Sequence, residues 1–497
     1  MNNATNPSAL PDLTADFLGK NIGPMDNLFA DLWKSVGMAG LLYRSGFHKR
    51  SGVPINEVMF CLMLWVWVKV NSISMFSRES LGTFSTAGKD VLYEALNRED
   101  WNWRGLHFKV ARKAVLQMNS PASTTAFVLD DSIKIRHGKK MPGISSHFDH
   151  TTGRHVMGQQ VLTLGLSCTE GFVPLDSELF ISKVKAQGLP TPFADGRSIA
   201  AKRYRVALDQ SKPEMAKAMI ARAQAGGINA DYLLADAWFG TKTMIKVAED
   251  AHLISIVRMK KSRMKYRLSE VKEGKVTYRN LDLNGLYQAG VRWQWEKIPG
   301  QRYQAKKLDV EVNLNDQKDD TERWIKVRLL FVQGIVEGDK PEAGKHDWVV
   351  FLTTDTSLSP QRILEIYAMR WAIEVYFKEA KQHLGFLKEQ ATHYASYIAS
   401  IHLCAIRFCL LAIAKLEHSV CNIAQTRHLI STNMTQIDCA AKLWQFFRAL
   451  ISGALDELKI LLGDTADLIM ETIELRIQRF FVQALQLDPL IMRLERS

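Results

Sequence analysis

The sequence predicts a mixed α/β fold, with a central sheet between helical regions at the two ends of the chain. Two short apolar runs end in carboxylates and have the length and composition of buried strands. Apolar and polar residues alternate through much of the stretch 262–347, as they do in strands that expose one face. Before about residue 118 and after residue 386, apolar residues recur at helical spacing instead, which predicts helices there.

The bulk composition is that of an ordinary globular protein, because 47% of the 497 residues are hydrophobic and 23% are charged. These values exclude disordered, collagen-like and low-complexity classes, and the length predicts roughly two to four domains. With 64 basic and 52 acidic residues the net charge is +12, which favours a polyanionic partner such as nucleic acid. A soluble enzyme that is merely basic is the alternative on charge alone.

Cysteine usage and hydropathy indicate a soluble cytoplasmic protein without a membrane partner. The six cysteines form no CxxC pair, which argues against a zinc ribbon and a disulfide framework. The polar N-terminus has no signal-peptide pattern. The longest apolar run, residues 58–68, is well short of the ~20 residues that cross a bilayer. The stretch 401–414 is interrupted by His402 and Arg407, so both segments are expected to be buried helices.

The first predicted elements are helices, which fill residues 1–118 with turns at 51–54 and 119–123. The segment 101–115 mixes tryptophan with arginine and lysine, a combination that suits contact with a DNA backbone. An amphipathic helix with a solvated basic face explains the same residues, and we favour that interpretation.

The middle of the chain is expected to supply the sheet. The predicted order is a buried strand over 125–132, a hairpin over 158–182 that turns at 168–170, a helix over 195–226, a buried strand over 230–240, a short helix over 241–252 and a strand over 253–260. An inserted β-rich subdomain is predicted over 262–347, and a buried strand over 348–354. Ser359 and Pro360 then begin a long helix, because proline is tolerated at an early helical position.

Two carboxylates at predicted strand ends are candidate site residues. Asp130 ends the strand in TAFVLDDS, and Asp236 ends the strand in ADYLLAD. A carboxylate at the end of an apolar strand is costly to bury unless it is paired or bound to a metal. Side chains at strand ends along one edge of a sheet commonly form sites. Each aspartate taken alone is equally explained as a cap or turn residue.

A third carboxylate lies in a cationic stripe on the helix predicted after Pro360. Five residues at spacings of 3, 4, 4 and 3 fall within about 80° around a helix axis; they are Tyr367, Arg370, Glu374, Lys378 and Lys381. The alternative is an ordinary salt-bridged helix face. However, the stripe is mainly cationic, which would hold Glu374 ionised and leave cations for phosphate groups.

Together the three carboxylates predict a site for two divalent metal ions. Oxygen-only ligands suit Mg²⁺, and Mn²⁺ can take its place. Two such ions about 3.5–4 Å apart activate the attacking oxygen and stabilise the leaving oxygen of a phosphoryl displacement. A glycoside hydrolase with paired carboxylates would not explain the cationic stripe.

The stripe resembles the Y-x2-R-x3-E-x6-K signature of the IS4-type family of bacterial insertion-sequence transposases, which is matched by Tyr367, Arg370, Glu374 and Lys381. The resemblance covers about residues 124–390. The D-x-[ST] pattern of the family matches Asp130-Asp131-Ser132, which favours Asp130 over its neighbour. The resemblance implies an RNase H-like core with a β-rich insertion, and a DDE catalytic and metal-binding site made of Asp130, Asp236 and Glu374.

The resemblance also implies DNA contacts. By position, Tyr367, Arg370, Lys378 and Lys381 would bind phosphates of the transposon end. Trp348 resembles a tryptophan that relatives stack on a flipped base, although a core strand residue is an equal alternative. Two basic groups are further candidates for backbone contact, or for solvated edge residues; they are Lys134, Arg136, Lys139 and Lys140, and Arg258, Lys260, Lys261, Arg263, Lys265 and Arg267.

The expected function is therefore cut-and-paste DNA transposition, with end nicking, a hairpin intermediate implied by the family, and strand transfer. Its partners would be the terminal inverted repeats, the target DNA and a second copy of the chain. The alternatives are a nuclease of the same fold without strand transfer and an inactive DNA-binding derivative. The expected domains are a helical DNA-binding region (1–118), a catalytic core (119–261 and 348–385), the insertion (262–347) and a helical C-terminal region (386–497) that contributes to dimerisation or simply forms its own core.

Overall fold

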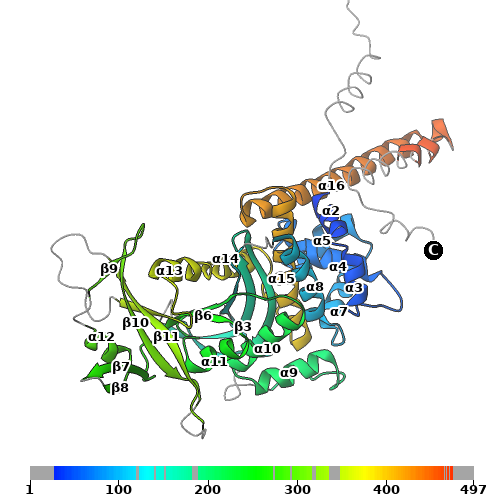
Figure 1. Cartoon of the computed structure of the whole chain (residues 1–497). Coiled ribbons are helices and arrows are strands. Elements are labelled where there is room, and N and C mark those ends of the chain that lie inside the picture. Colours follow the sequence, from blue (N-terminus) through cyan, green and yellow to red (C-terminus); the bar gives the residue numbers. More distant parts are fainter. Residues whose placement is uncertain are drawn as a thin grey trace, which may run out of the picture. The chain divides into compact units, whose positions relative to one another are not determined.

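The computed structural model of the chain is shown in Figure 1. It describes residues 27–118, 123–138, 141–149, 153–181, 188–272, 275–290, 294–315, 321–334, 348–463, 465, 467–469 and 471–473. The chain divides into two compact units, one made of Met1–Arg98 and Ala414–Ser497, and the other of Glu99–Ile413. Each unit is described by itself.

The first unit is helical throughout the part that the structure describes. Its elements are α2 (Leu28–Ser35), α3 (Met38–Arg44), α4 (Ile55–Leu64), the 3₁₀ turn η1 (Trp65–Trp67), α5 (Ile73–Glu79), α6 (Leu81–Phe84), α7 (Lys89–Asn97) and α16 (Ile423–Leu462). The apolar run 58–68 forms α4 and η1, and nearly all its side chains are buried, as predicted. The start and end of this discontinuous unit are joined by Asp438 of α16, which accepts hydrogen bonds from the hydroxyls of Ser80 and Thr83.

The second unit is built on one twelve-stranded sheet with both parallel and antiparallel pairs. Its strands are β1 (Ala126–Ile135), β2 (Ser145–Asp149), β3 (Arg154–Cys168), β4 (Gly171–Phe180), β5 (Tyr232–Ala235), β6 (Ile254–Met259), β7 (Tyr266–Lys272), β8 (Lys275–Leu281), β9 (Glu296–Lys297), β10 (Tyr303–Asn313), β11 (Trp324–Gly334) and β12 (Trp348–Thr353). The order is β2-β3-β1-β5-β6-β12-β11-β10-β7-β8, with β4 paired to β3 and β9 to β10. The predicted mixed α/β class is therefore confirmed.

The half of the sheet that contains β1 and β5 has the strand order β4-β3-β1-β5-β6. Strands β4, β3 and β1 are successively antiparallel, whereas β5 and β6 both run parallel to β1. This is the arrangement of an RNase H-like core. Parallel neighbours need crossover connections, and helices between β4 and β5 and between β5 and β6 provide them.

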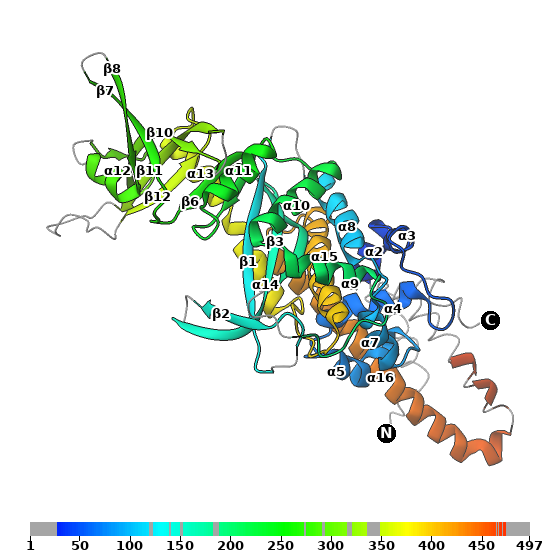
Figure 2. The same cartoon turned by 90° about the horizontal axis from the view of Figure 1, so that it is seen from below.

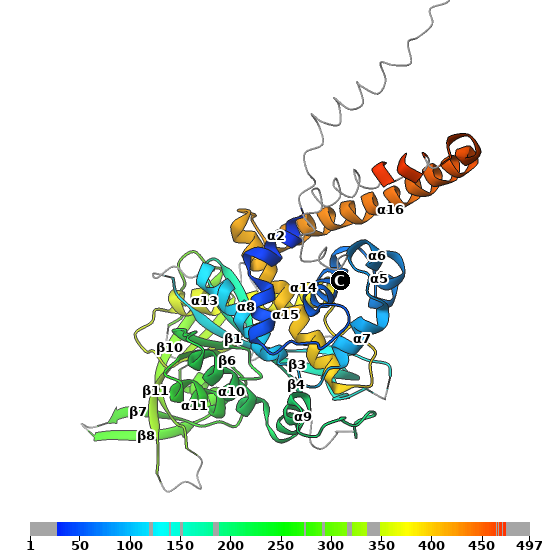
Figure 3. The ribbon, with the colours of Figure 1, turned by 90° about the vertical axis from the view of Figure 1, so that its right-hand side faces the viewer.

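Helices cover both faces of the core sheet. They are α8 (Trp103–Met118), α9 (Ile199–Asp209), α10 (Lys212–Ala225), α11 (Lys242–Asp250), α13 (Pro360–Ala368), α14 (Trp371–Gln382) and α15 (Tyr394–Glu417). α10 packs on β3 and β4 and α11 on β6, whereas α14 packs on β1 and β4 and α13 on β6. Figure 3 shows α10 and α11 on the side of the sheet opposite α13 and α14. The two faces of β1 therefore meet different helices.

The region predicted as an inserted β-rich subdomain extends the same sheet. β12 lies between β6 and β11 and is antiparallel to both, so β10 and β11 continue the core sheet by hydrogen bonding. Figure 2 shows β7 and β8 at the end of the unit away from β2. The region also contains α12 (Leu283–Ala289), whose first turn is capped by the Asp282 carboxylate at the Gly285 N–H. The alternation pattern did not predict this helix.

Two predicted helices are each interrupted. The helix expected over 195–226 is two helices, α9 and α10, because Ser211 and Glu214 form a capping box and Pro213 occupies the first turn of a new helix. The helix expected after Pro360 is divided into α13 and α14. At the break, the Met369 and Arg370 N–H groups donate to carbonyls three residues earlier, as in a 3₁₀ turn.

α15 is long and apolar enough to cross a membrane, but its most apolar stretch is completely buried in the protein. A core helix has the same properties, and the buried position agrees with the prediction for residues 401–414. His402 and Arg407, which interrupt its apolar sequence, are themselves buried. The Arg407 guanidinium donates to the Leu384 carbonyl at 2.7 Å. Burial of these two polar groups within the helix is therefore accompanied by specific hydrogen bonds.

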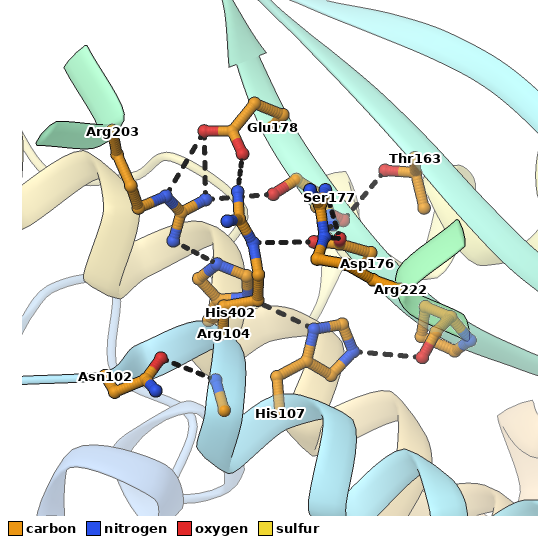
Figure 4. A network of polar contacts seen from close by, with 12 residues as sticks. Asn102, Arg104, His107, Thr163, Asp176, Ser177, Glu178, Arg203, Arg222 and His402 are labelled. Carbon is orange, nitrogen blue, oxygen red and sulfur yellow. Dashed lines mark hydrogen bonds and ion pairs between the residues drawn. The ribbon is translucent and has the colours of Figure 1, made fainter. Parts of the chain in front are cut away.

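A buried polar network fixes three helices to β4 (Figure 4). Asp176 of β4 pairs with Arg104 of α8 and Arg222 of α10, and Glu178 pairs with Arg104 and with Arg203 of α9. Asp176 and Glu178 point to the same face because they are two apart in a strand. Both carboxylates and Arg203 are buried, whereas Arg104 and Arg222 are partly exposed. The buried carboxylates require these partners, so the pairs fix orientation more than they add net stability.

Two histidines complete this network. The His107 and His402 Nδ1 atoms are 3.1 Å apart, His107 Nε2 is 2.9 Å from the Pro174 carbonyl, and His402 Nε2 is 2.8 Å from an Arg203 nitrogen. Arg203 can only donate, and the Pro174 carbonyl can only accept. All three contacts are therefore satisfied when both rings are neutral, with His402 donating from Nδ1 to His107. Burial lowers the pKa of His107 to about 4, which agrees with a neutral ring.

Candidate active site

Asp130 and Asp236 lie side by side where the parallel pairing of β1 and β5 ends, Asp130 within β1 and Asp236 just after β5. The ladder between β1 and β5 ends with Leu129 opposite Ala235, and the next residues along the two strands are the two aspartates. Asp236 also accepts a hydrogen bond from the Trp238 backbone N–H at 2.9 Å, which holds its carboxylate at the start of a tight turn. The strand-end position predicted for Asp236 agrees with the structure, whereas that predicted for Asp130 is wrong, because β1 continues to Ile135 by pairing with β3. The two carboxylates are neighbours because β5 ends beside Asp130.

Asp130 lies in an environment that disfavours its ionised form. The pKa of Asp130 is raised to about 7, mainly by burial and to a smaller extent by the negative charge of the neighbouring Asp236. The Asp131 N–H, 2.8 Å from Asp130 Oδ1, and the Arg370 guanidinium oppose this rise. Two like charges at one partly desolvated position favour either a shared proton or a bound divalent ion.

Asp131, the alternative to Asp130 in the sequence motif, faces the other side of β1. Its carboxylate accepts from Lys212 Nζ at 2.7 Å and from Gln160 Nε2 at 2.6 Å. Successive side chains of a strand point to opposite faces, so the two aspartates cannot both face the same helix. Asp131 is bound to α10, whereas Asp130 faces the helix pair α13 and α14.

Arg370 connects Glu374 to this aspartate pair. One guanidinium nitrogen lies 2.6 Å from Glu374 Oε1, and another lies 3.8 Å from Asp130 Oδ2. Arg370 also lies over the ring of Tyr367, with 5.5 Å to its centroid, and that ring packs edge-on against Phe351 of β12. Three of the five stripe residues are therefore brought to the carboxylates by the 3₁₀ break between the two helices.

The two lysines of the stripe lie further along α14. Lys378 is exposed and Lys381 is partly exposed, whereas Ile373 and Phe377 on the opposite side of the helix are buried. The predicted division of the helix into a cationic face and an apolar face therefore holds for α14.

The donor set fits divalent metal chemistry, although Glu374 is directed to Arg370. Among the residues that the structure describes, no group of three or more His, Cys, Asp or Glu side chains is arranged to hold a metal ion. The reason is visible in the contacts, because Arg370 occupies the position between Glu374 and Asp130. Asp130, Asp236 and Glu374 nevertheless supply only oxygen donors, which suit Mg²⁺. Burial and the charge of Asp236 both raise the pKa of Asp130, and a bound divalent cation would offset the repulsion between the two aspartates.

Trp348 is a core residue. It is 1% exposed, stacks on Tyr287 with ring centroids 4.6 Å apart, and contacts Phe331. Lys261 Nζ covers it at 3.7 Å from the ring centroid. Of the two interpretations of Trp348 made from the sequence, the structure agrees with a core strand residue. No face of the indole is available to a nucleobase in this conformation.

The first basic group is only partly on the surface. Lys134 lies near the end of β1, and Arg136 is buried, with its Nε donating to Gln159 Oε1 at 2.9 Å. Arg136 is therefore a structural residue more than a surface cation. Lys139 and Lys140 lie outside the described residues.

The second basic group is divided between β6, a loop and β7. Arg258, Lys260 and Lys261 are exposed at the end of β6 and just after it. The six residues do not share one strand, since β6 ends at Met259 and β7 begins at Tyr266. Further along, Arg267 is paired with Glu311 of β10. Lys260, Arg263 and Lys265 instead line a cavity of about 910 Å³ beside the start of α11.

The structure adds residues to the site that the sequence did not single out. A cavity of about 550 Å³ contains Asp130, Asp131 and Asp236, and also Lys212 from α10 and Trp238 from the loop after β5. Lys212 is 81 residues from Asp131, so no local pattern could link them. Trp238 did carry a local signal, because it follows the candidate carboxylate Asp236 by only two residues.

Two family models match parts of the chain. Residues 204–410 match the family described as Transposase DDE domain, and residues 74–280 match the family described as DDE superfamily endonuclease. Among solved structures, the chain is similar to a cryo-EM structure of a piggyBac transposase synaptic complex with hairpin DNA. That similarity has 11% sequence identity and a TM-score of 0.38, and covers 84% of this chain and 80% of the other. The comparison with curated proteins found no match.

Proposed function

We propose that this chain, which carries a catalytic domain of the DDE transposase superfamily, is an IS4-type transposase that cuts an insertion sequence out of DNA and joins it to a target. The observation that carries the proposal is the juxtaposition of Asp130 and Asp236 on parallel strands, with Glu374 linked to them through Arg370. The substrates are double-stranded DNA ends and a target duplex in the bacterial cytoplasm, and two copies of the chain hold two ends.

Asp130, Asp236 and Glu374 would hold the metal ions. Two Mg²⁺ ions, or Mn²⁺ in their place, supply Lewis-acid stabilisation of the attacking and leaving oxygens when bound. The chain itself supplies carboxylates fixed by β1, β5 and α14, and a cation, Arg370, that competes for Glu374. An incoming DNA phosphate offers Arg370 another anion, to which its planar donors are well matched.

The phosphate-binding surface extends from Arg370 along α14. Tyr367 presents a phenol next to Arg370, and Lys378 and Lys381 present ammonium groups on the same side of the helix. A series of donors on one rigid element fixes the position of a DNA backbone relative to the carboxylates. The same site would nick the end, form a hairpin with the freed 3′-hydroxyl, reopen it and join the 3′-hydroxyl to target DNA.

The test uses the full chain and a plasmid that carries the coding sequence with its flanking DNA. With Mg²⁺ we expect an excised fragment and its joining to a second plasmid, both abolished in Asp236→Asn. The matched control is Asp250→Asn, which removes a surface carboxylate paired with Arg323 and leaves activity intact. Cut ends without joined products would identify a nuclease instead, and DNA binding without any cleavage would identify an inactive derivative. Activity in Asp236→Asn would remove the site assignment.

A further inference from the structure

The break between α13 and α14 sets the direction in which Arg370 leaves the helix pair. The N–H groups of Met369 and Arg370 donate to carbonyls three residues earlier, and Arg370 directly precedes α14. A 3₁₀ turn has about 3.0 residues per turn and an α-helix about 3.6, so each residue in the break turns the chain by about 20° more. The geometry of the break therefore decides how Arg370 is oriented relative to Glu374 on α14.

The contacts of the Arg370 guanidinium come mainly from its own helix pair. Its hydrogen bond goes to Glu374, one turn further along, and its ring contact is with Tyr367. The Asp130 carboxylate lies 3.8 Å away. Within the described part of the chain, the buried Arg370 Nε has no hydrogen-bond partner. The position of the guanidinium over the sheet therefore depends on how the backbone is held at the break.

The backbone at the break is bonded to the sheet by Ser167 of β3. The Ser167 hydroxyl donates to the Met369 carbonyl at 3.1 Å, and Ser167 is 2% exposed. The same carbonyl also accepts from the Ala372 N–H, at 3.3 Å, as in a 3₁₀ turn. Ser167 thus adds a second hydrogen bond to the carbonyl that directly precedes Arg370.

β3 connects this hydrogen bond to the strand that carries Asp130. Ser167 pairs with Ala126 of β1, and Asp130 pairs with Thr163 further along the same ladder. Directly opposed residues of antiparallel strands point to one face, and residues two or four apart in a strand share that face. Ser167 and Asp130 therefore both face the helix pair. Because they belong to one hydrogen-bonded ladder, the sheet fixes the distance between the carboxylate and the break.

An apolar contact holds α14 on the same face of β3. The ring of Phe172 lies so close over Gly165 that any side chain at this position would clash with it. Phe172 also packs on Tyr376 of α14, with 5.9 Å between the ring centroids. Apolar packing is not directional, whereas a hydrogen bond is. The rings therefore hold α14 on the sheet, and the Ser167 hydroxyl fixes the rotation at the break.

We propose that Ser167 is a positioning residue for Arg370, which it keeps between Glu374 and Asp130. In a regular α-helix the Met369 carbonyl would accept from the N–H four residues later. Without the hydroxyl the break relaxes toward that geometry, and Arg370 turns away from Asp130. The inference rests on the proposed function and assigns to Ser167 a task that it performs through the backbone, without contact with DNA.

The test measures cleavage and DNA binding separately, with the full chain and DNA that flanks the coding sequence. Single-turnover cleavage is followed in Mg²⁺, and dissociation constants are measured in Ca²⁺. For Ser167→Ala we expect the cleavage rate to fall on the order of 10-fold, because a small misplacement of a catalytic group is costly. The dissociation constant should change less than about 2-fold. Ser167→Thr keeps the hydroxyl and should keep most of the wild-type rate.

A double-mutant cycle separates positioning from a general loss of structure. In the Arg370→Gln chain, Ser167→Ala should slow cleavage by less than about 2-fold, because no guanidinium is left to misplace. Ser431→Ala is the matched control, since it removes a serine hydroxyl that donates to the Trp67 carbonyl at 2.7 Å in the first unit, and it should keep the wild-type rate.

Three results would overturn the assignment of Ser167. They are an unchanged rate in Ser167→Ala, equal slowing by Ser167→Ala in the wild-type and Arg370→Gln chains, and a rate in Ser167→Thr as low as that in Ser167→Ala. A wild-type chain that binds the flanking DNA but does not cleave it contradicts the proposed function instead. The two failures are therefore distinguishable.

Discussion

Acidification should destabilise the second unit through the buried pair of histidines. In the unfolded chain His107 binds a proton near its ordinary pKa of about 6.5, whereas burial in the fold lowers its pKa to about 4. Between these two values the unfolded state therefore binds more protons, and stability falls as the pH falls. Above about pH 6.5 the two states bind equally and the effect is absent.

The magnitude follows from the difference in pKa. A shift from 6.5 to about 4 corresponds to about 3 kcal/mol of unfolding free energy, lost progressively from about pH 6.5 down to 4. Burial lowers the pKa of His402 well below its ordinary value too, and the charge of Arg203 adds to that effect. His402 therefore acts in the same direction, and the loss in the wild type should exceed that of one histidine.

The assay is urea unfolding of the full chain at several pH values between 7.5 and 4.5, followed by tryptophan fluorescence. His107→Gln keeps an amide donor for the Pro174 carbonyl but cannot titrate. The variant should be less stable at pH 7.5, yet its stability should change less with pH, by about one proton over this interval. His137→Gln, at an exposed loop position, is the control and should keep the wild-type slope. Equal slopes in wild type and His107→Gln would refute the reasoning.

Three other substitutions test the assignments at the active site and in the insertion. Arg370→Gln removes the cation between Asp130 and Glu374, and should slow single-turnover cleavage on the order of 100-fold, while the affinity for DNA changes far less. Replacement of both Lys378 and Lys381 by alanine should make the slope of log affinity against log salt less negative by about 2, as measured by titration between 50 and 200 mM salt. Trp348→Ala should lower the unfolding free energy by about 3–5 kcal/mol in urea, because it empties a packed aromatic cluster; an unchanged stability would show that the indole is not a core residue.

Local sequence patterns predicted those strands and turns that can be recognised from their own residues alone. Apolar runs that end in carboxylates identified β1 and β5, and the hairpin turn between β3 and β4 was found at residues 168–170. The break between α9 and α10 was also encoded locally, since Ser211 and Glu214 form a capping box, but the helical composition on both sides concealed it. The position of β12 between β6 and β11 depends on pairing between distant strands, which periodicity does not report.

In the candidate site too, contacts between residues far apart in the chain could not be predicted from the sequence. The sequence motif favoured Asp130 over Asp131, and the strand geometry accounts for the distinction, because the two side chains meet different helices. The helix signature placed Glu374 and Arg370 on one stripe, but it did not predict that the Arg370 guanidinium lies between Glu374 and Asp130. Lys212 is part of the cavity only through the packing of α10 on the sheet.

α10 connects the active-site cavity to the buried polar network. Near its start, Lys212 pairs with Asp131, and near its end Arg222 pairs with Asp176 of β4 (Figure 4). The two cations are ten residues apart, or about 15 Å along a helix. A helix held by ion pairs near both ends can neither slide nor rotate over the sheet without breaking one of them, and a buried charge that loses its partner is costly. The network therefore fixes the ammonium that pairs with Asp131, although none of its own residues lines the cavity.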